Sequence, residues 1–265
     1  MPLMDEFKKE RESMKDKPFK EKLGYFWYYY KWHTVGAVFF LIILITLVHD
    51  IATSKEIVFN ATFMNAYSLD MSGNTEGNAF LNEFAQLAGI DTEKYDVYLD
   101  TNMRFDLTSY DQASLAASQK FLAMSAAGEI DVVVSERDIF SNYADSGMFQ
   151  DLRDCLTEEQ LEKYADYFFY YDRTVLEREI DFEEVNNSDL TIPEDTVERR
   201  DPDSMSDPVP VGIFLDDSLN DRLIDAGYFI EDQELVFGIM GKEENRQNCL
   251  LFLDWLTDKN YVAGE

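Results

Sequence analysis

The two histidines and two cysteines limit the chemistry open to this chain, because these residues most often carry catalysis or bind transition metals. His33 and His49 flank the only long apolar run, at 34–48, so neither is placed to join a folded domain beyond that run. The sequence therefore disfavours Ser-His-Asp and Cys-His nucleophilic sites and a His-ligated metal site. No glycine-rich phosphate loop precedes a Lys-Ser/Thr pair either.

Carboxylates are the most abundant groups that could do chemistry. The 265-residue chain has 53 Asp+Glu against 23 Lys+Arg and a net charge of −30. A pair of carboxylates can hydrolyse glycosidic bonds, but with so many acidic residues no particular pair stands out. We expect a solvated acidic surface and a protein that is not an enzyme. The charge balance also argues against nucleic acid as a partner, because binding phosphates requires clustered Lys and Arg.

Calcium binding is an alternative at two acidic stretches. In the first stretch, oxygen ligands occupy every second position, at Asp70, Ser72, Asn74 and Glu76. The twelfth position from Asp70 is Leu81, where an EF-hand has a bidentate Glu, so a turn with a helix cap is the preferred interpretation. The second stretch, interpreted as a solvated loop, contains Asp181, Glu183, Glu184 and Asp189. We therefore predict no metal and no cofactor.

Cys155 and Cys249 are the only cysteines, which excludes a four-cysteine zinc site and a disulfide scaffold. Both follow the apolar run, and a disulfide between them could persist if this part of the chain is exported. A disulfide needs Cα atoms within ~7 Å, which the sequence does not determine. A Cys155–Cys249 disulfide and two separate buried thiols are both open.

A transmembrane helix is predicted at 34–50. Residues 32–49 are 18 consecutive positions without Lys, Arg, Asp or Glu. As a helix they would be about 27 Å long, close to the ~30 Å core of a bilayer. The preceding aromatic stretch YFWYYYKW, at 25–32, is typical of the headgroup layer. A cleaved signal peptide and a buried core helix are the alternatives, but the segment 1–33 is long for the head of a signal peptide.

The orientation of this anchor follows from charge. Residues 1–33 contain eight Lys/Arg and six Asp/Glu, whereas the remaining 232 residues contain 15 and 47. By the positive-inside rule, the cytoplasmic or interfacial segment is 1–33, and 51–265 is extracellular. We expect a single-pass signal-anchor protein of the cell membrane.

Strand-like and amphipathic stretches alternate beyond the anchor, which predicts one α/β lobe at 51–265. Strands are expected at 57–66, 95–99, 130–134, 209–215 and 235–240, and helices at 80–88, 111–127, 137–144, 157–169, 218–227 and 243–256. Such alternation favours a three-layer lobe with a mostly parallel sheet. The acidic loop 172–207 is different, because it holds 13 acidic residues and neither Lys nor Gly, and at most an edge strand is expected at 180–185.

Two stretches of the lobe resemble type 2 extracellular solute-binding proteins. In 126–164, Gly128-Glu-Ile-Asp131 begins a hydrophobic strand, and Gly147-Met-Phe-Gln-Asp151-Leu152 leads into a helix. In 235–256, a strand ends in Gly and a hydrophobic residue, and a helix ends in the pattern Phe-Leu-x-x-Leu. Proteins of this family close two lobes around a ligand. Only 172–207 stands where the second lobe would be inserted, so the resemblance implies a single ligand-binding lobe.

The expected ligand site lies at the carboxyl ends of the predicted strands, because ligands of open α/β sheets bind beyond these ends. Polar residues follow three of the strands and form the candidate ligand-binding set: Asn65, Tyr67, Ser68, Thr101, Asn102, Ser135, Glu136 and Arg137. Ser135 and its neighbours could instead cap the next helix, and for these residues capping is the preferred interpretation.

The leading hypothesis is a membrane protein that presents a non-catalytic lobe, similar to a solute-binding protein, for a small ligand or a protein partner. A scaffold component of an envelope assembly is the first alternative, and an exposed apolar patch would favour it. A hydrolase of envelope polymers is the second, and two carboxylates ~5–9 Å apart in a cleft would favour it.

Overall fold

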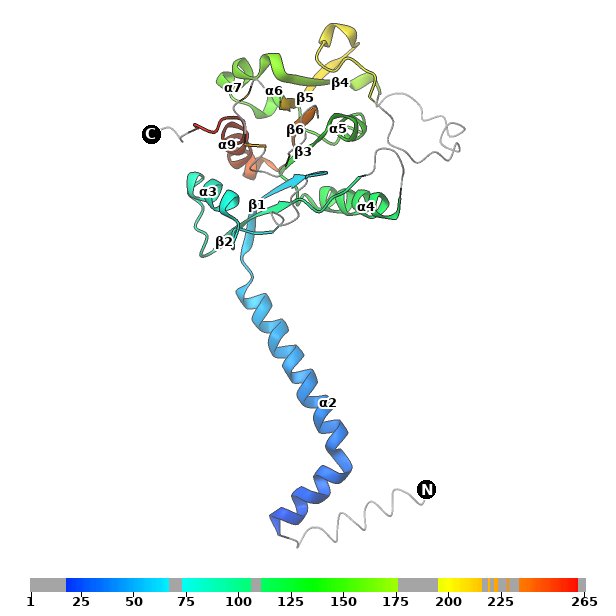
Figure 1. Ribbon diagram of the computed structural model, residues 1–265, viewed down its shortest axis with the longest axis vertical. Helices are drawn as coiled ribbons and strands as arrows, with labels where there is room; N and C mark the ends of the chain where they lie inside the picture. The colour runs from blue at the N-terminus through cyan, green and yellow to red at the C-terminus, as the bar shows by residue number, and fades with distance from the viewer. Residues whose placement is uncertain are drawn as a thin grey trace. The chain divides into compact units, whose positions relative to one another are not determined.

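The computed structural model describes residues 18–66, 73–105, 111–175, 195–215, 219, 222–223, 228 and 234–261. The chain divides into two compact units, Met1–Ser54 and Lys55–Glu265. Figure 1 gives the labels of the helices and strands.

Helix α2 (Phe19–Thr53) is the described helix of the first unit. Pro18, in an extended conformation, directly precedes it. Proline is tolerated at the start of a helix but not in its interior, so the helix begins after this residue. The part Tyr30–Thr53 is long and apolar enough to cross a membrane, and no residue of its most apolar window is buried. The hydroxyl of Thr46 donates to the carbonyl of Ile42, so this polar group is satisfied within the helix. The predicted apolar helix is thus present, compatible with a membrane anchor or a signal sequence.

A six-stranded sheet forms the centre of the second unit, in the order β2-β1-β3-β6-β5-β4. Its strands are β1 (Glu56–Phe63), β2 (Tyr95–Asp100), β3 (Val132–Glu136), β4 (Phe168–Asp172), β5 (Pro208–Leu215) and β6 (Leu235–Ile239). The prediction of an α/β lobe is confirmed. That of a mostly parallel sheet is not, because β1 pairs in parallel with β2 and β3 but the other three pairings are antiparallel.

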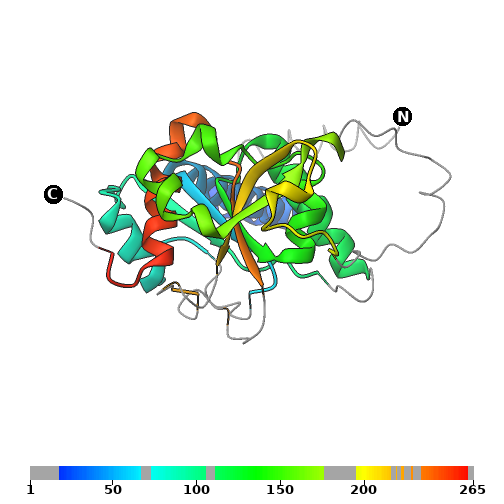
Figure 2. The ribbon, with the colours of Figure 1, turned by 90° about the horizontal axis from the view of Figure 1, so that it is seen from above.

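Helices cover both faces of this sheet, which gives three layers (Figure 2). Successive β3 residues alternate between two core clusters: Val132 and Val134 belong to one, Val133 to the other. The first cluster includes residues of α3 (Ala79–Leu87), α6 (Leu152–Cys155) and α9 (Arg246–Thr257), and the second includes residues of α4 (Gln112–Ala127) and α5 (Arg137–Ala144). Short elements complete the unit: α7 (Glu158–Lys163), η2 (Ala165–Tyr167), η3 (Arg173–Val175), η4 (Pro202–Ser204) and η5 (Glu243–Asn245). Both clusters lie wholly within Lys55–Glu265, so we expect this fragment to fold alone.

The largest difference from the predicted elements lies after α7. The capping box of Thr157 and Gln160 is present as predicted, but the helix ends at Lys163 rather than 169. The aromatic run Phe168–Asp172 forms edge strand β4, with Phe169 buried against β5. Aromatic residues pack well on the pleated surface of a sheet. Packing of this run against β5 therefore outweighs the tendency of the chain to continue the helix that begins at Glu158. The strand predicted at 180–185 and most of the helix predicted at 218–227 lie outside the described residues.

Two glycines face each other where α5 crosses the sheet. Gly212 of β5 pairs with Gly238 of β6. A Cβ atom at Gly238 would lie 2.6 Å from the ring of Phe140, and one at Gly212 would lie 2.8 Å from it. That ring stacks on Phe149, with centroids 4.1 Å apart. The missing side chains therefore make the space for the aromatic stack of the second core cluster.

We predict that Gly238→Ala lowers the free energy of unfolding of Lys55–Glu265 by about 1–3 kcal/mol, because it overfills this space. Adding Phe140→Leu should restore part of the loss. Urea unfolding measures both variants. An unchanged midpoint for Gly238→Ala would contradict the close contact.

Candidate functional site

A cavity of about 280 Å³ lies at the carboxyl ends of β1 and β3, and we name it the strand-end cavity. Asn65 follows β1, Arg104 and Phe105 follow β2, and Glu136 is the last residue of β3. The start of α4 completes the described lining with Asp111, Ala113 and Ser114. The ends of three strands thus converge on one cavity, as expected for a sheet in which β1, β2 and β3 run parallel.

Asn65 links two of the segments that line the strand-end cavity. Its φ of 55° is the only left-handed one among described residues other than glycine. Its side chain behaves like a strand partner of Phe105: Nδ2 donates to the carbonyl oxygen at 3.0 Å, and Oδ1 accepts from the amide at 2.7 Å. Its backbone amide donates to Met103. The turn after β1 is therefore bonded to the segment after β2. The bonds to Met103 and Phe105 fix the backbone on both sides of Arg104.

Glu136 is the carboxylate of the strand-end cavity. Burial raises its pKa, and a 3.4 Å hydrogen bond from Asn65 Nδ2 to Oε1 partly offsets this effect. Asp111, in contrast, accepts a hydrogen bond from the Ser114 amide at 2.8 Å and caps α4. The lining therefore combines a half-buried carboxylate, a guanidinium and an aromatic ring with the Asn65 amide, whose oxygen and nitrogen are bonded within the protein. Such a lining could bind a small polar molecule.

Tyr228 supports the cavity from within the protein. Its hydroxyl lies 2.6 Å from the carbonyl oxygen of Met64 and 3.0 Å from that of Val134, so it joins the ends of β1 and β3. Complete burial raises its pKa well above the usual value. Sequence reasoning missed this residue, because a lone tyrosine after a glycine carries no local signal of a contact more than ninety residues away.

The structure brings together only part of the predicted ligand-binding set. Asn65 and Glu136 line the cavity, whereas Thr101, Asn102, Ser135 and Arg137 are not among its described lining residues. Thr101 and Ser135 are fully buried, and Asn102 is exposed. Tyr67 and Ser68 lie outside the described residues. A cavity is present at the predicted strand ends, and the ligand role of each residue stays a prediction.

Most of the candidate calcium ligands lie outside the described residues. Asp70, Ser72 and the acidic residues Asp181, Glu183, Glu184 and Asp189 lie outside the described residues. Asn74 Oδ1 accepts from the Glu76 amide, as in a turn. The described part of the chain contains no group of three His, Cys, Asp or Glu that could hold a metal ion.

Cys155 and Cys249 are buried free thiols, so the structure has the second of the two cysteine arrangements. Cys155 Sγ donates to Gln150 Oε1 at 2.9 Å. Burial raises the pKa of both thiols. A raised pKa means less thiolate at neutral pH, which is typical of structural rather than reactive cysteines.

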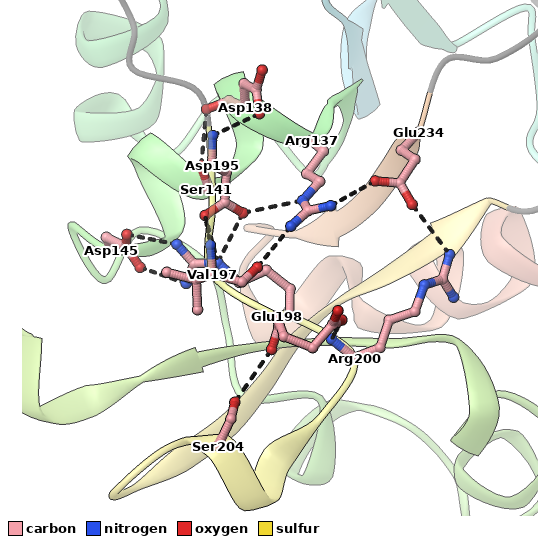
Figure 3. Close-up of polar contacts among 11 residues, drawn as sticks. Arg137, Asp138, Ser141, Asp145, Asp195, Val197, Glu198, Arg200, Ser204 and Glu234 are labelled. Atoms are coloured by element: carbon pink, nitrogen blue, oxygen red, sulfur yellow. Dashed lines mark hydrogen bonds and ion pairs between the residues drawn. The ribbon is translucent and has the colours of Figure 1, made fainter.

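Arg137 is not among the described lining residues of the strand-end cavity and instead belongs to a network of ion pairs (Figure 3). It contacts Asp195 at 3.2 Å and Glu234 at 2.8 Å, and donates to the Val197 carbonyl at 2.6 Å. Arg199 lies between two carboxylates, with contacts of 2.9 Å to Asp195 and 2.8 Å to Asp145. This network fastens the end of the acidic segment to α5.

We predict that Arg199→Met lowers the free energy of unfolding of Lys55–Glu265 by about 3–5 kcal/mol, because the Asp195 side chain, 2% exposed, then loses a buried partner. The matched control is Arg153→Met, which removes a half-exposed pair with Asp151 and should cost at most about 1 kcal/mol. Equal losses in urea unfolding would contradict the role given to the network.

We predict that Asn65→Gly costs about 1–2 kcal/mol of folding free energy, because both hydrogen bonds to Phe105 are lost. Asn65→Ala should cost about 1 kcal/mol more, since only glycine accepts the left-handed backbone freely. Urea unfolding of the two variants gives the order. The reverse order would show that the backbone at Asn65 is not left-handed.

No family model, curated protein or solved structure matches this chain, so its function is inferred from the geometry of the site alone.

Proposed function

We propose that this chain is a single-pass membrane protein whose extracytoplasmic lobe binds a small polar ligand at the strand-end cavity without catalysing a reaction. The observation that carries the proposal is the convergence of Asn65, Arg104 and Glu136, from the ends of three strands, on one cavity. Ligands of α/β sheets bind at such ends. The lobe would act as one half of a type 2 solute-binding protein, the family that two of its stretches resemble.

The membrane placement rests on α2 and on charge. Tyr30–Thr53 is long enough to span a bilayer, and basic residues gather at 1–33, whereas acidic residues dominate the rest. The positive-inside rule then puts the N-terminus in the cytoplasm and the lobe outside the cell. A receptor for external solutes would have this arrangement.

The size and charge of the cavity limit the ligand. A volume of about 280 Å³ lies just below the range of ~300–1,000 Å³ typical of ligand sites, so the ligand would be small. A guanidinium and a carboxylate in the lining favour a molecule with at least one charged group.

The alternative functions have less support. A docking surface for a scaffold would present a large apolar patch, but α4 exposes only two large aliphatic side chains, Leu115 and Leu122, among its described residues. A hydrolase would need a second carboxylate beside Glu136. The other carboxylate in the described lining, Asp111, is already engaged as the cap of α4.

The test is a thermal-shift screen of Lys55–Glu265 with amino acids, small organic acids, sugars and short peptides. A ligand at 100 times its Kd should add about 2.7 kcal/mol to the free energy of unfolding. Glu136→Gln should abolish this shift, since it removes the charge in the cavity. Glu158→Gln, on exposed α7, is the matched control and should retain it.

Two results would overturn the proposal. The first is the absence of any shift both in the fragment and in the full chain in nanodiscs. The second is a shift that survives Glu136→Gln unchanged, which would place the ligand elsewhere on the lobe.

A further inference from the structure

Helix α4 has an exposed face that repeats along the sequence. The pattern Gln-x-x-Leu-Ala-x-Ser occurs at 112–118 and again at 119–125. Seven residues make almost two helical turns, so equivalent positions of the two repeats lie on the same side of the helix. We name this side the heptad face, and its exposed residues are Gln112, Leu115, Ala116, Gln119, Leu122, Ala123 and Ala126.

The core of the lobe does not account for the heptad face. The buried residues of α4 are Ser114, Ala117 and Phe121, which lie on the opposite side of the helix. A helix that packs on one side normally carries charged residues on the other. The heptad face carries none, and its leucines, Leu115 and Leu122, are 42% and 48% exposed. Uncharged residues with leucine at every seventh position are typical of a contact between two helices.

Charge also distinguishes α4 from the other helices of the lobe. Residues 112–127 contain no Asp or Glu, and Lys120, their one charged residue, pairs with Asp100 of β2. Every other α-helix that the structure describes within Lys55–Glu265 contains an acidic residue: α3 (Glu83), α5 (Asp138), α6 (Asp154), α7 (Glu158) and α9 (Asp254). Since the chain has a net charge of −30, two copies repel each other at most surfaces. Among these helices, α4 is where a second copy meets the least repulsion.

The heptad face is also complementary to itself. In paired helices, a leucine of one helix inserts between residues of the other. Ala116 and Ala123, beside the two leucines, are small and leave room for the leucines of a partner. Gln119 lies at the centre of the face, and its amide group can both donate and accept. It can therefore pair with the same amide of a second copy across a two-fold axis.

We propose that the heptad face binds the heptad face of a second copy of this chain, which gives a two-fold symmetric dimer. Two heptads make a small contact, at the low end of specific interfaces (below ~1,200 Å²), so the dimer is weak in dilute solution. Anchoring by α2 would confine the copies to one membrane and raise their effective concentration. The contact needs no ligand in the strand-end cavity, and only its strengthening by the membrane rests on the function proposed above.

Cysteine crosslinking of the full chain in liposomes tests this contact. In a Gln119→Cys variant, residue 119 lies near its own equivalent whether the two helices run parallel or antiparallel, so mild oxidation should link the copies. Glu158→Cys, at an exposed position of α7, is the matched control. We expect at least about tenfold more crosslinked dimer from Gln119→Cys, by analogy with the gain from confinement. The native cysteines are buried, and the unmodified chain measures their background.

Charge variants separate the heptad face from general repulsion between acidic lobes. Leu115→Glu with Leu122→Glu, added to Gln119→Cys, puts like charges into the contact and should reduce crosslinking at least about tenfold. Both leucines are exposed, so the variant should fold, and its urea midpoint checks this. Gln86→Glu with Gln247→Glu adds the same charge at exposed positions of α3 and α9 and should leave crosslinking unchanged.

Three results would each overturn the proposal. The first is the absence of crosslinked dimer from Gln119→Cys, and the second is equal crosslinking of Glu158→Cys. The third is an equal loss of crosslinking in the Gln86 and Gln247 control pair, which would show that total charge and not the heptad face controls association.

Discussion

The buried carboxylate of Asp131 joins the parallel and the antiparallel halves of the sheet. Its side chain bonds to β1 through the Asn60 amide and to the segment before α9 through Asn245. Its carbonyl oxygen accepts from the amides of Met240 and Gly241, just after β6. Strand β3 is the last parallel strand and the first antiparallel one, so its start must meet both partners at once. A carboxylate with two acceptor atoms, together with a backbone carbonyl that accepts from two amides, satisfies this constraint.

Fixing β3 also fixes the two cavities. The strand-end cavity lies at the carboxyl end of β3, whereas Asp131, just before its start, lines a second cavity, of about 630 Å³. Helix α4 reaches both, because Asp111 caps it at the first cavity and Gly128, with φ of 66°, ends it at the second.

Ion pairs explain how so acidic a chain folds. Arg137 and Arg199 each lie between two carboxylates contributed by different segments. Few basic residues are available, and the structure places both of these beside Asp195, whose side chain is only 2% exposed and would be costly to leave unpaired. The segment after the undescribed part of the acidic loop is thereby bound to α5, the helix that follows β3.

The sequence by itself determined the local features. The apolar run predicted α2, glycine predicted the end of α4, and Thr157 with Gln160 predicted the start of α7, because each depends on a few adjacent residues. The rule that strand ends carry ligand sites led to Asn65 and Glu136. Resemblance and composition gave the hypothesis of a single binding lobe.

Only the tertiary structure decided the rest. The direction of β4, β5 and β6 depends on partners far along the chain, and the ionic role of Arg137 depends on Asp195 and Glu234. No pattern in the neighbouring sequence predicts the contacts of Tyr228 or of Asn60. Such features arise when segments far apart in sequence bury their polar groups together. The free energies of hydrogen bonding and desolvation depend on distance and burial in the folded structure, not on spacing along the chain.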